Sequence, residues 1–151
     1  MSSFLLAIIS QRLINPNVFH TFVIVSRQEV TALLNLIHEI NEEKDSVVVV
    51  EGKRDSYALK CIGFSCKILE FHRFGGLTKF SDSVSGHKNI ILLFDSDRKG
   101  RYLTRRVIEQ LERRAKINLY YKKRLNQITG GKIRTIEEIS QYKDALFGVI
   151  I

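Results

Sequence analysis

Two short apolar runs in this sequence each end in carboxylates. Val47 to Val50 leads into Glu51, and Ile90 to Phe94 leads into Asp95 and Asp97. In an open parallel sheet the carboxyl ends of neighbouring strands share one crevice, so side chains far apart in the chain can meet there. We therefore expect Glu51, Asp95 and Asp97 to form one acidic site.

The residue types at this site favour a hard divalent cation. Carboxylate oxygens suit Mg²⁺ or Mn²⁺, and such ions usually serve phosphate chemistry. Asp95 and Asp97 are two positions apart, so on an extended segment both side chains point to the same side and can address one ion. Zinc is disfavoured, because the two cysteines and four histidines are scattered without the spacing of zinc ligands.

The elements that must position these carboxylates begin with an amphipathic helix. Ser26, followed three residues later by Glu29, fits a capping box that would start this helix. Apolar residues then recur at helical spacing and predict one buried face, with Leu36 off the stripe. The stripe consists of Val30, Leu33, Leu34, Ile37 and Ile40.

Strands and helices alternate along the rest of the chain. Alternation with short connections implies a right-handed, mainly parallel α/β sheet of four strands flanked by helices. A second capping box, Thr135 with Glu138, is predicted to start a last short helix that runs to Tyr142. The predicted strands are 47–50, 67–71, 90–94 and 117–121, and the other predicted helices are 55–62, 77–84 and a segment from Gly100 to Ala115.

We expect one domain over residues 27–151, because the chain of 151 residues is 44% hydrophobic and long enough to bury one sizeable core. Residues 1–26 hold the only proline and no charge pattern that suggests a site, so they are interpreted as an N-terminal extension outside that domain, either packed on it as a strand or helix or the product of a start codon placed too early. The apolar start lacks a basic region and is too short for export or a bilayer span, which predicts a cytoplasmic protein without a membrane partner. Cys61 and Cys66 are expected to be reduced.

The charge balance is basic. The chain has 24 Lys and Arg against 16 Asp and Glu, a formal net charge of +8, and such an excess attracts polyanions. Nucleic acid is therefore the first partner to consider. Lys53, Arg54, Arg98 and Lys99 flank the carboxylates in sequence, and we predict that they position a nucleic-acid backbone.

Three further residues at the strand ends are candidates for the site. Gly52 and Gly100 would allow close backbone approach at the strand-to-helix turns, so that helix N-terminal amides can meet phosphate oxygens; turn geometry alone is the alternative. Asp55 is interpreted either as an additional acidic ligand or as the cap of the following helix, with capping favoured.

These strand-end segments resemble the two motifs of the Toprim domain. Glu51-Gly52-Lys53-Arg54-Asp55 resembles the first motif and Asp95-Ser96-Asp97-Arg98-Lys99-Gly100 the second, and the resemblance covers about residues 45–121. The domain is shared by topoisomerases, bacterial primases, a class of DNA repair nucleases, recombination-repair proteins and bacterial ribosomal-RNA maturases. With its run from Lys122 to Ile139, the whole chain is similar to small stand-alone Toprim proteins of archaea.

The resemblance implies a Toprim-like, Rossmann-like core with N- and C-terminal additions. It also implies that Glu51 is a general acid or base in phosphodiester chemistry and that Asp95 and Asp97 hold Mg²⁺. The E-G-K form of the first motif is closest to that of the ribosomal-RNA maturases, so we expect a Mg²⁺-dependent nuclease that acts on RNA or DNA.

Two other functional classes fit parts of the pattern. One is a non-catalytic nucleic-acid-binding module, or a subunit of a repair, replication or RNA-processing complex. The other is an aspartyl-phosphate phosphotransferase, in which D-x-D also follows an apolar strand. The second class is disfavoured, because its first aspartate lies near the start of the domain, whereas here a strand ending in Glu51 comes first.

Overall fold

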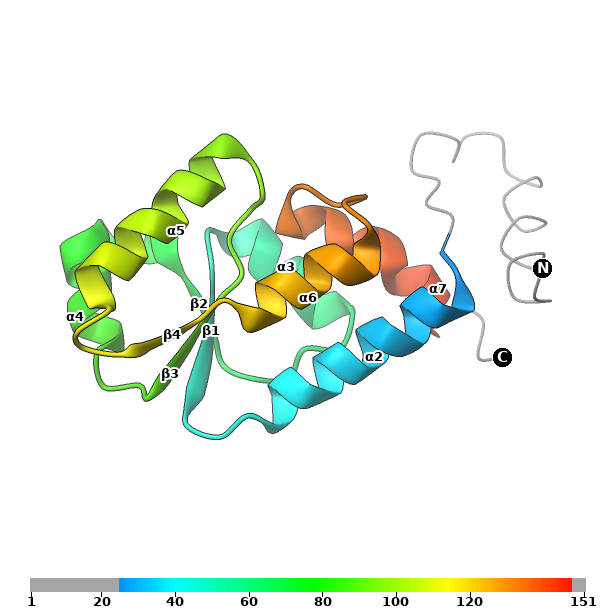
Figure 1. The fold of residues 1–151 in the computed structure, drawn as a ribbon, viewed down its shortest axis with the longest axis horizontal. Helices are drawn as coiled ribbons and strands as arrows, with labels where there is room; N and C mark the ends of the chain where they lie inside the picture. Colours follow the sequence, from blue (N-terminus) through cyan, green and yellow to red (C-terminus); the bar gives the residue numbers. More distant parts are fainter. Residues whose placement is uncertain (1–24, 148–151) are drawn as a thin grey trace.

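The structure, a computed structural model, describes residues 25–147 of the chain. Its centre is a sheet of four parallel strands in the order β2-β1-β3-β4 (Figure 1). These strands are β1 (Ser46–Val50), β2 (Ile68–Glu70), β3 (Asn89–Leu92) and β4 (Lys116–Asn118). The predicted fold class, a parallel four-stranded α/β sheet flanked by helices, is confirmed.

Six α-helices flank the sheet in the described part of the chain. They are α2 (Arg27–Glu42), α3 (Lys53–Cys61), α4 (Leu77–Val84), α5 (Arg98–Leu111), α6 (Tyr120–Thr129) and α7 (Lys143–Phe147). Two 3-10 segments, η2 (Phe71–Phe74) and η3 (Ile136–Tyr142), complete the order of elements. None of the helices in residues 25–147 is both long and apolar enough to cross a lipid bilayer.

The helices cover both faces of the sheet, which explains why the central strands are continuous apolar runs. Along β1, Val48 and Val50 pack in one core with α2, α3, α6, η3 and α7. Val47 and Val49 point to the opposite face and pack in a second core with α4 and α5. Figure 1 shows the same division, with α4 and α5 on one side of the sheet and α2 and α6 on the other.

Helix α2 begins as the sequence predicts, because the Ser26 side chain accepts a hydrogen bond from the Glu29 N–H at 3.1 Å. The predicted stripe is wrong at two positions. Leu36 is buried, with 1% of its surface exposed, whereas Leu34 is 39% exposed. Leucines stand on both sides of the predicted stripe, so the contact with α6 and α7, and not the spacing alone, decides which of them is covered.

The predicted strand over residues 117–121 is wrong in its second half, because β4 ends at Asn118 and Tyr120 starts α6. The Asn118 side chain accepts the Tyr120 N–H at 2.9 Å, which turns the chain out of the sheet. Tyr121 is then buried against α2, where its hydroxyl donates to Glu43 Oε1 at 2.6 Å. The aromatic pair is thus explained by helix packing and not by a strand.

The second predicted capping box is also wrong. The Thr135 side chain makes no capping hydrogen bond, and the segment that follows is the 3-10 segment η3. The Glu138 carboxylate instead accepts the Arg134 N–H at 2.9 Å, which fixes the turn before η3.

The predicted N-terminal extension, residues 1–26, lies almost wholly outside the described residues. Of its last two residues, Val25 is buried with 1% of its surface exposed, and Ser26 caps α2. The packed part of the chain therefore begins no later than Val25.

Candidate metal centre

The sheet order brings the two predicted motifs together. β1 and β3 are neighbours, with Val49 opposite Leu92 in the ladder, so the segments that follow them leave the sheet side by side. The Asp95 N–H donates to Glu51 Oε1 at 3.2 Å, which joins the two segments directly. A glutamate at the end of one strand is thereby held by the backbone of the other.

Three carboxylates gather at this edge of the sheet. Glu51, Asp95 and Asp97 each offer one oxygen, and these oxygens all lie within 4.8 Å of one another. Glu51 is only 6% exposed, and the two aspartates are half-buried. The predicted meeting of these residues is confirmed, and the cluster can bind a metal ion.

Both aspartates are oriented by backbone amides. Asp95 Oδ1 accepts the Ile136 N–H at 2.7 Å, and Asp97 Oδ1 accepts the Gly100 N–H at 2.7 Å as the cap of α5. For the second oxygen of each aspartate, the described residues supply no hydrogen bond. Each side chain is therefore held by one oxygen and presents the other to a ligand.

The electrostatics of the cluster suit a cation. Burial, together with repulsion from neighbouring carboxylates, raises the pKa of Glu51 and of Asp95 above their ordinary values. None of the ion pairs formed within residues 25–147 includes a carboxylate of the cluster. A donor set of oxygens alone, carrying negative charge that no ion pair offsets, suits a metal cation.

Asp55 makes a capping hydrogen bond from the third position of α3. Its carboxylate accepts the Gly52 N–H at 3.1 Å at the start of α3, and it is not a member of the cluster within 4.8 Å. Burial and repulsion from Asp95 raise its pKa. Asp55 therefore lies next to the cluster and adds to its negative potential while it holds the turn after β1.

The two glycines differ in what they make room for. A Cβ on Gly100 would lie 2.1 Å from the backbone oxygen of Asp95, so only glycine fits at this turn. A Cβ on Gly52 would meet nothing closer than His72, at 3.5 Å, and its φ of −145° is ordinary extended backbone. Close backbone packing is confirmed for Gly100, whereas an approach of phosphate to Gly52 stays a prediction.

The four predicted backbone-binding cations lie on the two helices that follow the strand ends. Lys53 and Arg54 occupy the first turn of α3, Arg98 and Lys99 the first turn of α5, and all four are exposed. Lys53 and Arg54 also line a pocket of about 380 Å³ between α3 and η3. Their contact with nucleic acid stays a prediction.

Two contributors to the site were missed in the sequence. Lys122 on α6 is half-buried; burial lowers the pKa of its ammonium group, while Asp95 and Glu51 oppose that shift. It was missed because residues around it were interpreted as the end of a strand. The other is the Ile136 N–H that holds Asp95, a backbone group for which no side chain gives a signal.

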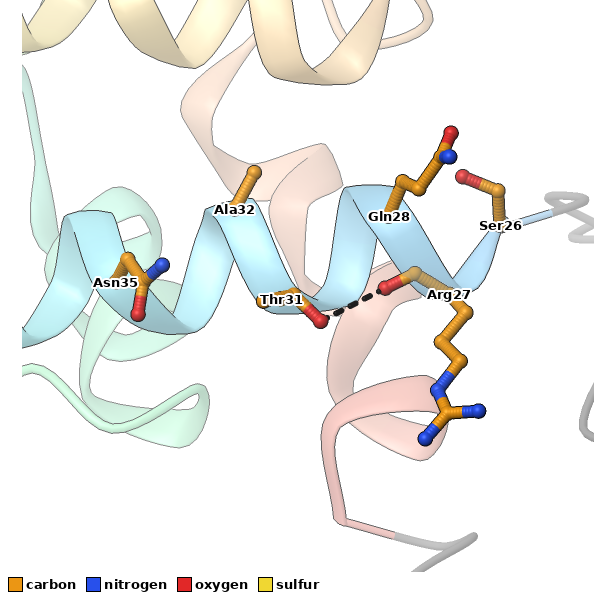
Figure 2. Close-up of a pocket in the computed structure, with 6 residues that line it drawn as sticks. All are labelled: Ser26, Arg27, Gln28, Thr31, Ala32 and Asn35. Atoms are coloured by element: carbon orange, nitrogen blue, oxygen red, sulfur yellow. Dashed lines mark hydrogen bonds between the residues drawn. The ribbon is translucent and has the colours of Figure 1, made fainter.

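A separate pocket of about 570 Å³ runs along the first turns of α2 (Figure 2). Its described lining residues include Arg27 and Thr31, whose hydroxyl donates to the Arg27 carbonyl at 3.1 Å. No carboxylate, imidazole or thiol is among the described residues that line it. Side chains that could bind a metal ion therefore line the acidic cluster and not this pocket.

Comparison with known proteins gives relatives of similar length. A UPF0292 protein from Archaeoglobus fulgidus is 33% identical over 116 residues, which cover 75% of this chain and 90% of the relative. A UPF0292 protein from Methanocaldococcus jannaschii is 31% identical over 113 residues, which cover 73% of this chain and 88% of that protein. A solved structure of a protein from Aquifex aeolicus aligns with a TM-score of 0.58 and 27% identity, covering 70% of this chain and 96% of that one. No protein-family model matches the chain.

Proposed function

The chain belongs to the UPF0292 family of archaeal proteins, and on that premise we propose that it is a Mg²⁺-dependent nuclease of the Toprim type that acts on RNA or DNA. The observation that carries this proposal is the cluster of Glu51, Asp95 and Asp97, drawn from two neighbouring strands, with oxygens within 4.8 Å of one another. An all-carboxylate site in a chain with a net charge of +8 suits a polyanionic substrate that needs a divalent ion.

In this proposal the free oxygens of Asp95 and Asp97 would hold the ion, with the Glu51 carboxyl group beside it. When bound, Mg²⁺ neutralises phosphate charge and lowers the pKa of water. The hydrogen bonds from Ile136 and Gly100 support this role, because they fix each aspartate without using both of its oxygens.

Glu51 is the proposed proton carrier. Its Oε1 accepts the Asp95 N–H, so Oε2 is the atom that takes or gives the proton. Burial raises the pKa of Glu51, and a carboxyl group whose pKa lies closer to neutral is a better general acid or base at physiological pH. Lys53, Arg54, Arg98 and Lys99 would steady the phosphate backbone around it.

The proposal is tested by incubating the purified protein with a panel of structured RNAs and DNAs in Mg²⁺, Mn²⁺ or chelator. Cleavage is expected with either ion and not in chelator. Glu51→Gln and Asp95→Asn should abolish cleavage while circular dichroism shows an unchanged fold. The matched control is Asp144→Asn, which removes an exposed carboxylate on α7 and should cleave like the wild type.

Wild-type rates in purified Glu51→Gln or Asp95→Asn protein would refute the mechanism. A different outcome would favour the non-catalytic alternative: no cleavage by any form, with nucleic-acid binding that persists in chelator and in Asp95→Asn. The same panel therefore separates a nuclease from a binding module.

A further inference from the structure

A cavity of about 410 Å³ opens beside Asp95, between α5 and α6. Arg101 lines it from α5, and Lys122, Lys123 and Asn126 line it from α6. Its volume falls in the range of about 300 to 1,000 Å³ that small-molecule sites occupy. Because Asp95 belongs both to this lining and to the acidic cluster, the cavity adjoins the proposed metal centre.

The charge around this cavity is mainly positive. Arg101, Lys122 and Lys123 face it together with a single carboxylate, that of Asp95. Across the described part of the chain, none of the ion pairs includes any of these three cations. Arg124, one residue further along α6, is by contrast paired with Glu39 at 2.6 Å. Arg101 and Lys123 are therefore available to an anion, whereas Lys122 is shared between the cavity and the acidic cluster, whose Asp95 and Glu51 attract its ammonium group.

The neutral polar groups also favour a ligand that accepts hydrogen bonds. The Ser96 hydroxyl donates to Asn126 Oδ1 at 3.4 Å, so the amide nitrogen of Asn126 is the part left to donate. Guanidinium, ammonium and amide N–H groups around one cavity suit an oxyanion with several acceptor oxygens. Phosphate is the oxyanion that a nucleic acid carries at every nucleotide.

We infer that this cavity binds one phosphate group of the substrate while the neighbouring phosphate group lies at the acidic cluster. Arg101, Lys122 and Lys123 are the contacts of the phosphate in the cavity. The inference rests on the proposed function, because it takes the substrate to be a nucleic acid. Two sources share this chemistry, a terminal 5′-phosphate and an internal phosphodiester.

The experiment measures binding of fluorescent single-stranded oligonucleotides by anisotropy over a range of salt concentrations, in chelator and with Ca²⁺ in place of Mg²⁺. The test variants are the double Arg101→Gln and Lys123→Gln, which changes exposed residues, and the single Lys122→Gln. The matched control is the double Lys60→Gln and Lys116→Gln. Both control residues are exposed; Lys60 lies in the last turn of α3 and Lys116 at the amino end of β4, away from the cluster.

The cavity double variant should bind on the order of tenfold more weakly than the control double variant, which has the same net charge. Its plot of log affinity against log salt should be shallower by about 0.7, the contribution of one phosphate contact on a single strand. Lys122→Gln should weaken binding in the same direction, and Lys122→Arg should restore it because the charge returns.

Oligonucleotides with a 5′-phosphate or a 5′-hydroxyl distinguish the two sources. If the cavity holds a terminal phosphate, the wild type prefers the phosphorylated form and the cavity double variant does not. If it holds an internal phosphodiester, both oligonucleotides bind the wild type equally and both lose affinity in the double variant.

Equal affinity and equal salt dependence of the cavity and control double variants, with thermal melts showing that both are folded, would overturn the inference. This outcome is separate from failure of the nuclease proposal, because the binding assay requires no cleavage. If the wild type cleaves and the cavity variants bind normally, the nuclease proposal stands and the cavity inference is wrong. If the protein never cleaves but the cavity variants lose affinity, the cavity inference stands and the nuclease proposal is wrong.

Discussion

The ends of β1 and β3 supply the same cluster in different ways. After β3, Asp95 and Asp97 are each held by a backbone amide, and Gly100 packs so closely that a Cβ would lie 2.1 Å from the Asp95 carbonyl oxygen. After β1, one longer side chain, Glu51, reaches across to the Asp95 N–H, and Gly52 has room for a Cβ. In the function we propose, the β3 end therefore holds the ion, whereas the β1 end presents the buried group that exchanges a proton.

Replacement of Gly100 tests the segment that follows β3 and should have the largest effect. A Cβ cannot fit against the Asp95 carbonyl without a backbone shift, so Gly100→Ala should lower the free energy of unfolding by about 3 kcal/mol or more and displace the metal ligands. Urea denaturation measures the first effect and Mn²⁺ titration the second. Gly86→Ala is the control, because a Cβ there meets nothing within 4 Å. Equal stability of the two variants would show that the turn after β3 can shift to make room for a Cβ.

Asparagine at Asp95 and at Asp55 separates a ligand from a neighbour. Asp95→Asn removes a carboxylate of the cluster, and its Mn²⁺ affinity should fall by more than about 100-fold, whereas Asp55→Asn should lose only about tenfold, the lower end of the range for a group that lies next to the ligands. Asparagine oxygens can still accept the Ile136 and Gly52 N–H groups, so neither fold should change. Calorimetric titration with Mn²⁺ measures both constants. A larger loss in Asp55→Asn would place that residue among the ligands.

Mg²⁺ should stabilise the protein in a pH-dependent way. In the folded protein the pKa values of Glu51 and Asp95 are raised above their ordinary values of 4.5 and 3.8. Above the raised pKa values the ionised carboxylates lower the stability of the fold. This loss is relieved as the pH falls through the raised values toward the ordinary ones. Without metal, stability should therefore gain from these groups as the pH drops from neutral. At pH 7 and a Mg²⁺ concentration 100 times Kd, the ion should add about 2.7 kcal/mol.

The Mg²⁺-dependent gain should shrink as the carboxylates are protonated, and thermal melts with and without Mg²⁺ from pH 5 to pH 8 measure it. In Glu51→Gln the pH dependence should be weaker, because one titrating group is gone. A Mg²⁺ gain of the same size at pH 5 and pH 8 would place the ion somewhere other than this cluster.

The smallest effect is expected at Gly52. Its φ is ordinary and a Cβ would make only an ordinary contact with His72 at 3.5 Å, so Gly52→Ala should change the free energy of unfolding by less than about 0.5 kcal/mol and leave Mn²⁺ affinity intact. If phosphate approaches this backbone as the sequence predicts, nucleic-acid affinity should nevertheless fall. A Gly52→Ala protein that binds nucleic acid like the wild type would limit the role of Gly52 to the turn itself.

The parallel sheet and the meeting of three carboxylates could be predicted, because both follow from local patterns. Continuous apolar runs such as Val47 to Val50 indicate strands buried on both faces, and residues that follow neighbouring parallel strands must share an edge. The cap at Ser26 is likewise predictable, because it depends only on the four residues from Ser26 to Glu29. These features depend on spacing along one segment and on a general rule of sheet topology.

What could not be predicted depends on contacts between distant segments. Tyr121 is buried where its hydroxyl reaches Glu43, 78 positions away, and the burial of Leu36 in preference to Leu34 is decided by the neighbours of α2. Lys122 lies near Asp95 because it belongs to the same helix, α6, whose start was predicted to be a strand. Ile136 contributes only a backbone N–H, which any residue but proline carries.

That amide has a consequence for how the protein is made. The group that orients Asp95 comes 41 positions after it in the chain, from a segment that also gives the Arg134 carbonyl to the Ser96 N–H. During translation the three carboxylates are synthesised well before the turn that aligns one of them. The hydrogen bond that orients Asp95 can therefore form only after Ile136 has left the ribosome, and a fragment that stops after β4 would carry the three acids without it.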